Sequence, residues 1–227
     1  MGKFSFYELF SFVAPGFGVI LITKFYLIYV FGLDIINIFD KTVIDIFFLF
    51  TLALFIGILL QILTFSILKW KSLKWYKNIV FKCPNDISSK LKHISNIIPY
   101  LIEYYRKNNK HHLNKDYDKV TADDVFDLAY YYLEVNDKIG STKKFQSMYF
   151  WLRNTLTVCL FNHLFSLFIF LYVLIVNNPL YSTRHAFLFL IFNLLLFLLL
   201  LYPTKWLREK MVIKLFWSFY TDLITKK

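Results

Sequence analysis

Apolar residues gather in four long runs along the chain, and polar residues separate these runs. A helix that crosses a bilayer needs about 20 predominantly apolar residues, and each run approaches or exceeds that length. The pattern predicts spans over 12–32, 43–68, 156–176 and 185–201. The expected fold is therefore an all-α polytopic membrane protein with four transmembrane helices.

The longest polar stretch lies between the second and third runs, and it is the only region able to form a domain outside the bilayer. We expect four parts: a first helix pair, a helical cytoplasmic insert, a second helix pair and a basic amphipathic tail. Their bounds are 1–68, 69–153, 154–202 and 203–227. The tail mixes Lys and Arg with Trp and Phe, which predicts a helix lying along the inner membrane interface.

Helical periodicity continues within the insert. Apolar positions at 4-3-4-3-4 spacing predict a helix from Asn85 to Asn108, kinked at Pro99. A second helix is expected to begin at the N-cap Thr121 and to end at Gly140. From Ser141 onward there is no breaker, so a third helix is expected to run directly into the third span.

Composition and charge then fix the class and the orientation. Of the 227 residues, 58% are hydrophobic and 21% aromatic, which exceeds what a soluble core of this length requires. Of the 26 basic residues, 16 lie in 69–153 and six follow Tyr202. Because Lys and Arg near span ends remain in the cytoplasm, both termini and the insert are expected there. Together with a composition typical of low-GC prokaryotes, this predicts a multi-pass protein of the bacterial inner membrane.

Several polar side chains interrupt the predicted spans. Lys24 costs roughly 2.5–3.5 kcal/mol at mid-bilayer, and Asp45 of the antiparallel second span is its expected counter-charge. The other polar residues of the spans are Gln61, Asn162, His163 and Asn193. They either line an aqueous path, at a subunit interface for example, or form interhelical hydrogen bonds worth about 0.6 kcal/mol each. The second alternative is favoured for each of these residues except Lys24, which requires water or a counter-charge.

Two pairs of residues suggest how the spans are placed. Pro15 and Gly16, near the start of the first span, form a candidate hinge. Trp151 and Arg153 precede the third span, where Trp favours the headgroup level and Arg reaches toward water by snorkelling.

The polar segment after Asn108 offers one catalytic candidate. Arg106 precedes His111 by five residues and His112 by six, a spacing similar to the catalytic motif of HEPN-type ribonucleases. In such enzymes a cation steadies the phosphate and a His moves protons. A lysine-rich turn also produces this spacing by chance, and we favour that interpretation, so the protein is not expected to be an enzyme.

Metal and cofactor motifs are not evident. His93, His111 and His112 with Asp116 and Asp118 lack the ligand spacing of structural zinc sites. The glycine-rich phosphate loops and the GxSxG and HExxH motifs are absent from the sequence, so no cofactor is expected. The net charge of +11 is explained mostly by the inner-leaflet bias, so nucleic-acid binding is not indicated.

A family resemblance can be drawn from the motifs FVAPG at 12–16 and YFWLRN at 149–154, together with four spans and a helical insert. These features resemble small bacterial membrane proteins found beside antiviral defence systems: the membrane accessory proteins of type VI-B CRISPR loci and the membrane subunit of Kiwa. Some of those accessory proteins carry a divergent Arg-to-His motif similar to Arg106–His111. The resemblance implies a role in antiviral defence.

Two functions follow as expectations. The leading one is an oligomeric inner-membrane effector or accessory protein in which a cytoplasmic signal leads to membrane permeabilisation or depolarisation, with Lys24 at a pore or subunit interface. The alternative is a membrane anchor or scaffold that recruits a soluble cytoplasmic defence protein through the insert, with Lys24 balanced by Asp45. The expected partners are the lipid bilayer, further copies of the chain and that soluble protein.

Overall fold

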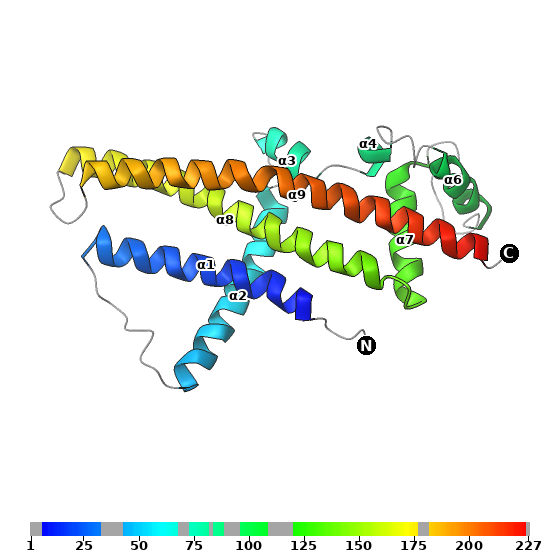
Figure 1. The fold of residues 1–227 in the computed structure, drawn as a ribbon, viewed down its shortest axis with the longest axis horizontal. Coiled ribbons are helices and arrows are strands. Elements are labelled where there is room, and N and C mark those ends of the chain that lie inside the picture. Colours follow the sequence, from blue (N-terminus) through cyan, green and yellow to red (C-terminus); the bar gives the residue numbers. More distant parts are fainter. Residues whose placement is uncertain are drawn as a thin grey trace. The chain divides into compact units, whose positions relative to one another are not determined.

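The computed structural model describes residues 6–32, 43–67, 73–81, 84–88, 96–108, 120–176 and 182–225, and every regular element in these ranges is an α-helix (Figure 1). Four helices are long: α1 (Phe6–Tyr29), α2 (Val43–Ile67), α8 (Gly140–Val176) and α9 (Thr183–Thr225). Each contains a segment long and apolar enough to cross a membrane. The prediction of an all-α polytopic membrane protein is confirmed.

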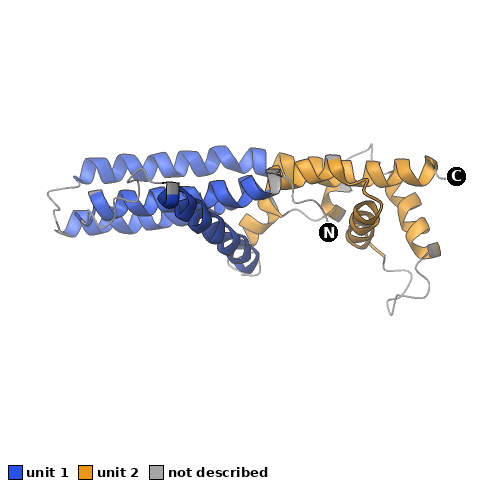
Figure 2. Ribbon diagram, turned by 90° about the horizontal axis from the view of Figure 1, so that it is seen from below, with its two compact units in different colours: residues 1–73, 150–204 blue, residues 74–149, 205–227 orange. Residues whose placement is uncertain are grey.

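The described chain divides into two compact units, which Figure 2 shows in separate colours. Unit 1 comprises residues 1–73 and 150–204, and unit 2 comprises residues 74–149 and 205–227. Each of the two longest helices therefore contributes residues to both units. The predicted insert forms most of unit 2, but the predicted tail belongs to the same unit rather than standing as a separate segment.

Unit 1 contains a close crossing of α1 and α2. The buried residues Val13 and Ile20 of α1 pack with Leu49 and Ala53 of α2. A Cβ atom placed on Gly16 would fall onto the carbonyl of Ala53, and a Cβ on Gly57 would fall onto the carbonyl of Phe12. Small residues that let two backbones approach are typical of helix pairs in membranes.

A second apolar contact of unit 1 joins three helices, α1, α8 and α9. Tyr26 and Val30 of α1 pack with Ile169 and Val173 of α8 and with Ala186 of α9. In Figure 1, α8 and α9 lie side by side over this region. In this contact α1 thus meets residues of α8 that lie more than 130 positions later in the sequence.

α8 and α9 both extend beyond their spans. α8 runs without interruption from Gly140 to Val176, which confirms the expected continuity between the insert and the third span. α9 also continues through Pro203 to Thr225, so the fourth span and the tail form one helix rather than two separate segments. That the tail lies along the membrane interface stays a prediction. Pro203 lacks the N–H that would bond the Leu199 carbonyl, and helices in membranes tolerate such a proline. One residue further on, the Thr204 hydroxyl donates to the Leu200 carbonyl, 2.7 Å away.

Unit 2 contains the end of α9 and the short helices α3 (Lys74–Val80), α4 (Pro84–Ser88), α6 (Ile97–Asn108) and α7 (Ala122–Val135). The end of α9 packs against α6 and α7. Leu207, Met211, Leu215, Phe219 and Leu223 repeat every fourth residue on the buried face of α9. Phe219 lies between Tyr104 of α6 and Tyr132 of α7, with ring centroids 5.9 and 5.1 Å away. This packing explains why the tail belongs to unit 2.

The ends of these short helices differ in part from the prediction. Pro99 lies in the first turn of α6, where its missing N–H is tolerated, and it does not kink a longer helix. Thr121 does cap α7, because Asp124 accepts hydrogen bonds from its backbone N–H and its hydroxyl, both 2.9 Å long. Gly140 begins α8 rather than ending α7. The turn is made instead by Asp137 at φ 56°, a left-handed conformation that Asp tolerates.

Candidate functional site

The first candidate site is a buried set of polar side chains in unit 1, which we call the asparagine cluster: Tyr26, Asn162, Ser166 and Asn193. The Tyr26 hydroxyl donates to Oδ1 of Asn162 (3.0 Å) and lies 2.8 Å from the Ser166 hydroxyl. The Asn162 amide donates to Oδ1 of Asn193 (2.5 Å), and the Asn193 amide donates to Ser166 (2.9 Å). All four side chains are buried, and they join α1, α8 and α9.

The asparagine cluster accounts for two of the polar residues that the sequence places inside the spans. Asn162 and Asn193 bond to each other and to other helices of the same chain, as the interhelical hydrogen-bond alternative requires. Sequence reasoning missed Tyr26 and Ser166. The i,i+4 spacing of Asn162 and Ser166 on one helix face was an available signal, whereas Tyr26 lies in an aromatic run that gives none.

The second candidate site, the arginine cluster, comprises Arg153, Gln61, Phe65 and Phe150. The Arg153 side chain is fully buried, and its guanidinium donates to Oε1 of Gln61 on α2. Its Cζ atom also lies over the rings of Phe65 and Phe150, 4.5 and 4.7 Å from their centroids. These contacts differ from the expected snorkelling, because the guanidinium is held inside unit 1. A hydrogen-bond acceptor and two aromatic faces stabilise the charge there.

A threonine pair adds a further polar contact between α2 and α8. Thr64 Oγ1 lies 3.2 Å from Thr157 Oγ1, and both residues are fully buried. Each hydroxyl also donates to a carbonyl one turn earlier in its own helix, that of Leu60 or Arg153. Interhelical contacts of this kind are typical of packed membrane helices.

The remaining polar residues of the spans are half-buried. Lys24 lies on α1, and Asp45 lies in the first turn of α2. Their pairing stays a prediction. His163, next to the asparagine cluster, has no hydrogen-bond partner for Nδ1 in the part of the chain that the structure describes. Nδ1 of His163 therefore adds no bond to the asparagine cluster in the described chain.

The candidate hinge and the interfacial tryptophan are also placed. α1 continues unbroken through Pro15, and Gly16 is buried against α2. Gly16 thus has a packing role that the hinge interpretation did not include. Trp151 is half-buried and lies 5.9 Å from Phe10, centroid to centroid. Its depth in a bilayer stays a prediction.

Unit 1 also contains an apolar pocket of about 490 Å³ beside the asparagine cluster. Tyr26 and Asn162 belong to its wall, and residues such as Ile22, Leu60 and Phe165 supply most of its surface. A pocket of this kind, largely apolar with few polar groups, has the general character of a small-molecule site.

The catalytic candidates are only partly described. Arg106 lies near the end of α6, half-buried. His111 and His112 lie outside the described residues, as do His93, Asp116 and Asp118, so the ribonuclease spacing stays untested. Within the described ranges, no group of three His, Cys, Asp or Glu side chains could hold a metal ion.

Unit 2 carries a buried arginine of its own. Arg208 of α9 is buried, and its Cζ atom lies 4.7 Å from the Phe81 ring centroid and 5.3 Å from that of Phe126. On α7, burial raises the pKa of Asp127, the charges of Asp123 and Asp124 raise it further, and the positive charge of Arg208 opposes them.

Across the α6–α7 contact, burial similarly raises the pKa of Tyr105, and Asp124 and Asp127 add to that effect. Unit 2 therefore holds an acidic helix face beside a buried cation and a tyrosine.

Comparison with models of known protein families gives no match, and comparisons with curated proteins and with solved structures give none either. The function must therefore be inferred from the clusters themselves. In the described chain they offer amides, hydroxyls and guanidinium groups that join helices to one another, an arrangement suited to holding a membrane bundle together.

Proposed function

We propose that this chain is a non-enzymatic, multi-pass protein of the bacterial inner membrane that anchors a helical cytoplasmic unit and recruits a soluble partner through it. The supporting observation is that the asparagine and arginine clusters satisfy polar groups between helices of one chain. Side chains that bond to one another in this way do not require an aqueous path to satisfy them. The basic residues concentrated in 69–153 and after Tyr202 support a cytoplasmic position for unit 2.

An exposed apolar pair in unit 2 supports recruitment. Tyr131 and Val135 are one turn apart on α7, and they are 67% and 85% exposed. Exposed apolar side chains that adjoin on a helix face are suited to contact another protein. The resemblance to defence-associated membrane proteins supports a cytoplasmic defence protein as that partner.

Proximity labelling from the full-length chain in bacterial cells tests recruitment. Replacing both Tyr131 and Val135 by Ser is expected to remove one labelled soluble protein without lowering the membrane level of the chain. Glu134→Gln, on the same helix, is the matched control and is expected to retain it. An unchanged labelling pattern in the double variant would argue against this surface.

A second candidate function, permeabilisation by an oligomer, is favoured by Lys24. This ammonium lies within the candidate span Leu9–Ile28, where it requires water or a counter-charge. If Lys24 faces a pore, Lys24→Leu abolishes dye leakage from reconstituted vesicles and leaves expression intact. If Asp45 balances it, Lys24→Leu loses folded protein, and adding Asp45→Leu restores part of it.

The particle mass in mild detergent separates the two functions further. A ring of four or more copies supports permeabilisation by a central path. A monomer or dimer supports the anchor, because so few copies leave no room for a central channel. Native mass spectrometry gives this number directly.

A further inference from the structure

A second pocket lies within unit 2, on the face of α9 that begins at Lys214, and it has a volume of about 360 Å³. Unlike the pocket of unit 1, it has ammonium groups in its wall, together with hydroxyl groups. The lining residues used below are Lys138, Lys214, Trp217, Ser218, Thr221 and Asp222. All except Lys138 belong to α9, and positions 214, 217, 218 and 221 share one helix face.

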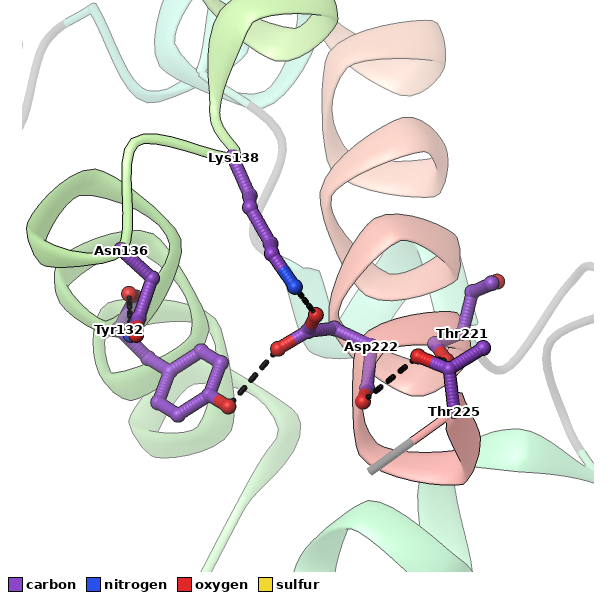
Figure 3. A network of polar contacts seen from close by, with 6 residues as sticks. All are labelled: Tyr132, Asn136, Lys138, Thr221, Asp222 and Thr225. Atoms are coloured by element: carbon purple, nitrogen blue, oxygen red, sulfur yellow. Dashed lines mark hydrogen bonds and ion pairs between the residues drawn. The ribbon is translucent and has the colours of Figure 1, made fainter. Parts of the chain in front are cut away.

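Lys138 comes from the turn after α7, and Asp222 holds it at the pocket (Figure 3). The Lys138 ammonium forms an ion pair with Oδ1 of Asp222, and the Tyr132 hydroxyl donates to Oδ2 over 2.8 Å. The Asp222 side chain is only 5% exposed, whereas that of Lys138 is 48% exposed. The buried carboxylate thus fixes a cation whose head remains open to solvent.

The donors at this pocket fit a tetrahedral oxyanion. An ammonium carries three N–H donors, so the Asp222 contact leaves Lys138 with donors to spare. Lys214 adds a second exposed ammonium, and Ser218 and Thr221 add hydroxyls. Lysine ammonium groups bind phosphate as point charges, and a phosphate offers several acceptor oxygens to donors from different sides. We propose that this pocket binds the phosphate group of an anionic ligand.

Two sources of negative charge lie at the pocket, the Asp222 carboxylate and the C-terminus of α9, and neither prevents the binding of phosphate. Both carboxylate oxygens of Asp222 already accept donors, from Lys138 and Tyr132, so its charge is compensated locally. The partial negative charge at the C-terminus of α9 acts mainly within the last turn. Lys214 and Ser218 lie further upstream. Trp217, 40% exposed, supplies an aromatic wall for the organic part of the ligand.

This site goes beyond the proposed function and does not depend on it. The phosphate could belong to a soluble molecule or to a lipid headgroup, and two forms of the full-length protein distinguish these sources. The protein in phosphatidylcholine nanodiscs is titrated with inorganic phosphate by calorimetry. In parallel, nanodiscs containing phosphatidic acid are examined by native mass spectrometry for retained lipid.

Lys214→Gln is the main variant, because Lys214 lines the pocket and its side chain is exposed, whereas the Lys138 ammonium is the one paired with Asp222. It is expected to weaken phosphate or phosphatidic acid binding about tenfold, equivalent to about 1.4 kcal/mol, because one of the two ammonium groups at the pocket is lost. Lys138→Gln is expected to weaken binding at least as much. Lys210→Gln is the charge-matched control on the same helix: Lys210 lies 5.7 Å from the Trp206 ring centroid and does not line the pocket.

Each outcome of these binding measurements either supports or rejects the proposed phosphate site. Phosphate binding that requires Lys214 but not Lys210 supports a soluble ligand, and retention of phosphatidic acid with the same dependence supports a lipid headgroup. If neither probe binds, the proposal is overturned. If Lys210→Gln weakens binding as much as Lys214→Gln, the attraction is general surface charge and the site is likewise rejected.

Discussion

The two units of this protein place their polar and apolar side chains in opposite ways. In unit 1 the side chains of Asn162, Ser166 and Asn193 are buried, while large apolar residues such as Ile44 and Phe47 of α2 are 79% and 72% exposed. In unit 2, Phe216 and Phe219 are fully buried, and lysines such as Lys210 and Lys214 lie on the surface. The contrast indicates that the units are adapted to different solvents.

The buried cations of the two units sharpen this contrast. Arg153 in unit 1 and Arg208 in unit 2 both lie against aromatic rings. Arg153 donates to the neutral amide of Gln61, whereas the charge of Arg208 offsets part of the rise in the pKa of the Asp127 carboxyl on α7. Each unit therefore stabilises its buried arginine by a different combination of aromatic and polar neighbours. The stabilities of variants in the two units can be compared on this basis.

The largest loss of stability is expected from substitutions at the α1–α2 crossing of unit 1. Gly16→Ala and Gly57→Ala would each place a methyl group on a backbone carbonyl, which cannot move aside as a flexible side chain could. Overpacking typically costs about 1–3 kcal/mol, and a backbone obstacle places these variants at or above that range. Thermal unfolding in mild detergent measures the loss.

Gly18→Ala is the matched control for these variants, because an added Cβ at Gly18 meets no atom within 4 Å. It is expected to leave the unfolding temperature unchanged or slightly raised, since alanine is favoured over glycine in a helix by about 0.5–1 kcal/mol. Equal unfolding temperatures for Gly16→Ala and Gly18→Ala would contradict the close crossing.

A smaller loss is expected when the arginine cluster is altered. Gln61→Leu removes an acceptor from a fully buried guanidinium, which should destabilise the protein by about 1.5–3 kcal/mol. Adding Arg153→Met removes the charge as well and should recover much of that loss, because an apolar side chain suits the space between Phe65 and Phe150. A double-mutant cycle of unfolding free energies measures the coupling, and strictly additive losses would count against it.

A substitution in the asparagine cluster should lower the free energy of unfolding by a smaller amount still. Asn193→Leu removes bonds to Asn162 and Ser166, and interhelical hydrogen bonds in membranes average about 0.6 kcal/mol, with a maximum near 1.7. His163→Leu is the control, since His163 neighbours Asn162 and has an Nδ1 atom without a hydrogen bond in the described chain. If both variants unfold at the same temperature, the cluster contributes nothing measurable.

The lengths of the spans could be predicted because they depend on local composition. The second span was expected over 43–68 and α2 covers Val43–Ile67, and the third ends at Val176 in both the prediction and the structure. The cap at Thr121 followed from a short motif in the same way. Length, apolarity and capping are all encoded within a few turns of chain.

The contacts between helices could not be predicted from such windows. Tyr26 meets Ser166 across 140 positions of sequence, and nothing near Tyr26 indicates this partner. Gly16 suggested a hinge because glycine gives the same local signal whether it frees a backbone or admits a neighbouring helix. The tail was expected as a separate part from residue 203, but α9 continues through this point, and its buried face extends from Leu207 to Leu223.

The smallest expected effect concerns the acidic face of unit 2. Because the pKa of Asp127 is raised in the folded state, the folded chain binds more protons than the unfolded chain at pH values between the ordinary and the raised pKa. Ionisation of Asp127 therefore lowers stability as pH rises through this window, and stability returns as pH falls through the raised pKa. Asp127→Asn should slightly raise the unfolding temperature at neutral pH and flatten its dependence on pH.

Glu103→Gln is the control for this variant, since it also removes one negative charge from unit 2. Glu103 lies 3.1 Å from Lys107 in an exposed pair, so its loss should leave stability unchanged or slightly lower. Unfolding temperatures of both variants between acidic and neutral pH make the comparison. A stabilising effect of Glu103→Gln equal to that of Asp127→Asn would assign the gain to net charge, whereas a gain confined to Asp127→Asn assigns it to crowding with Asp123 and Asp124 on α7.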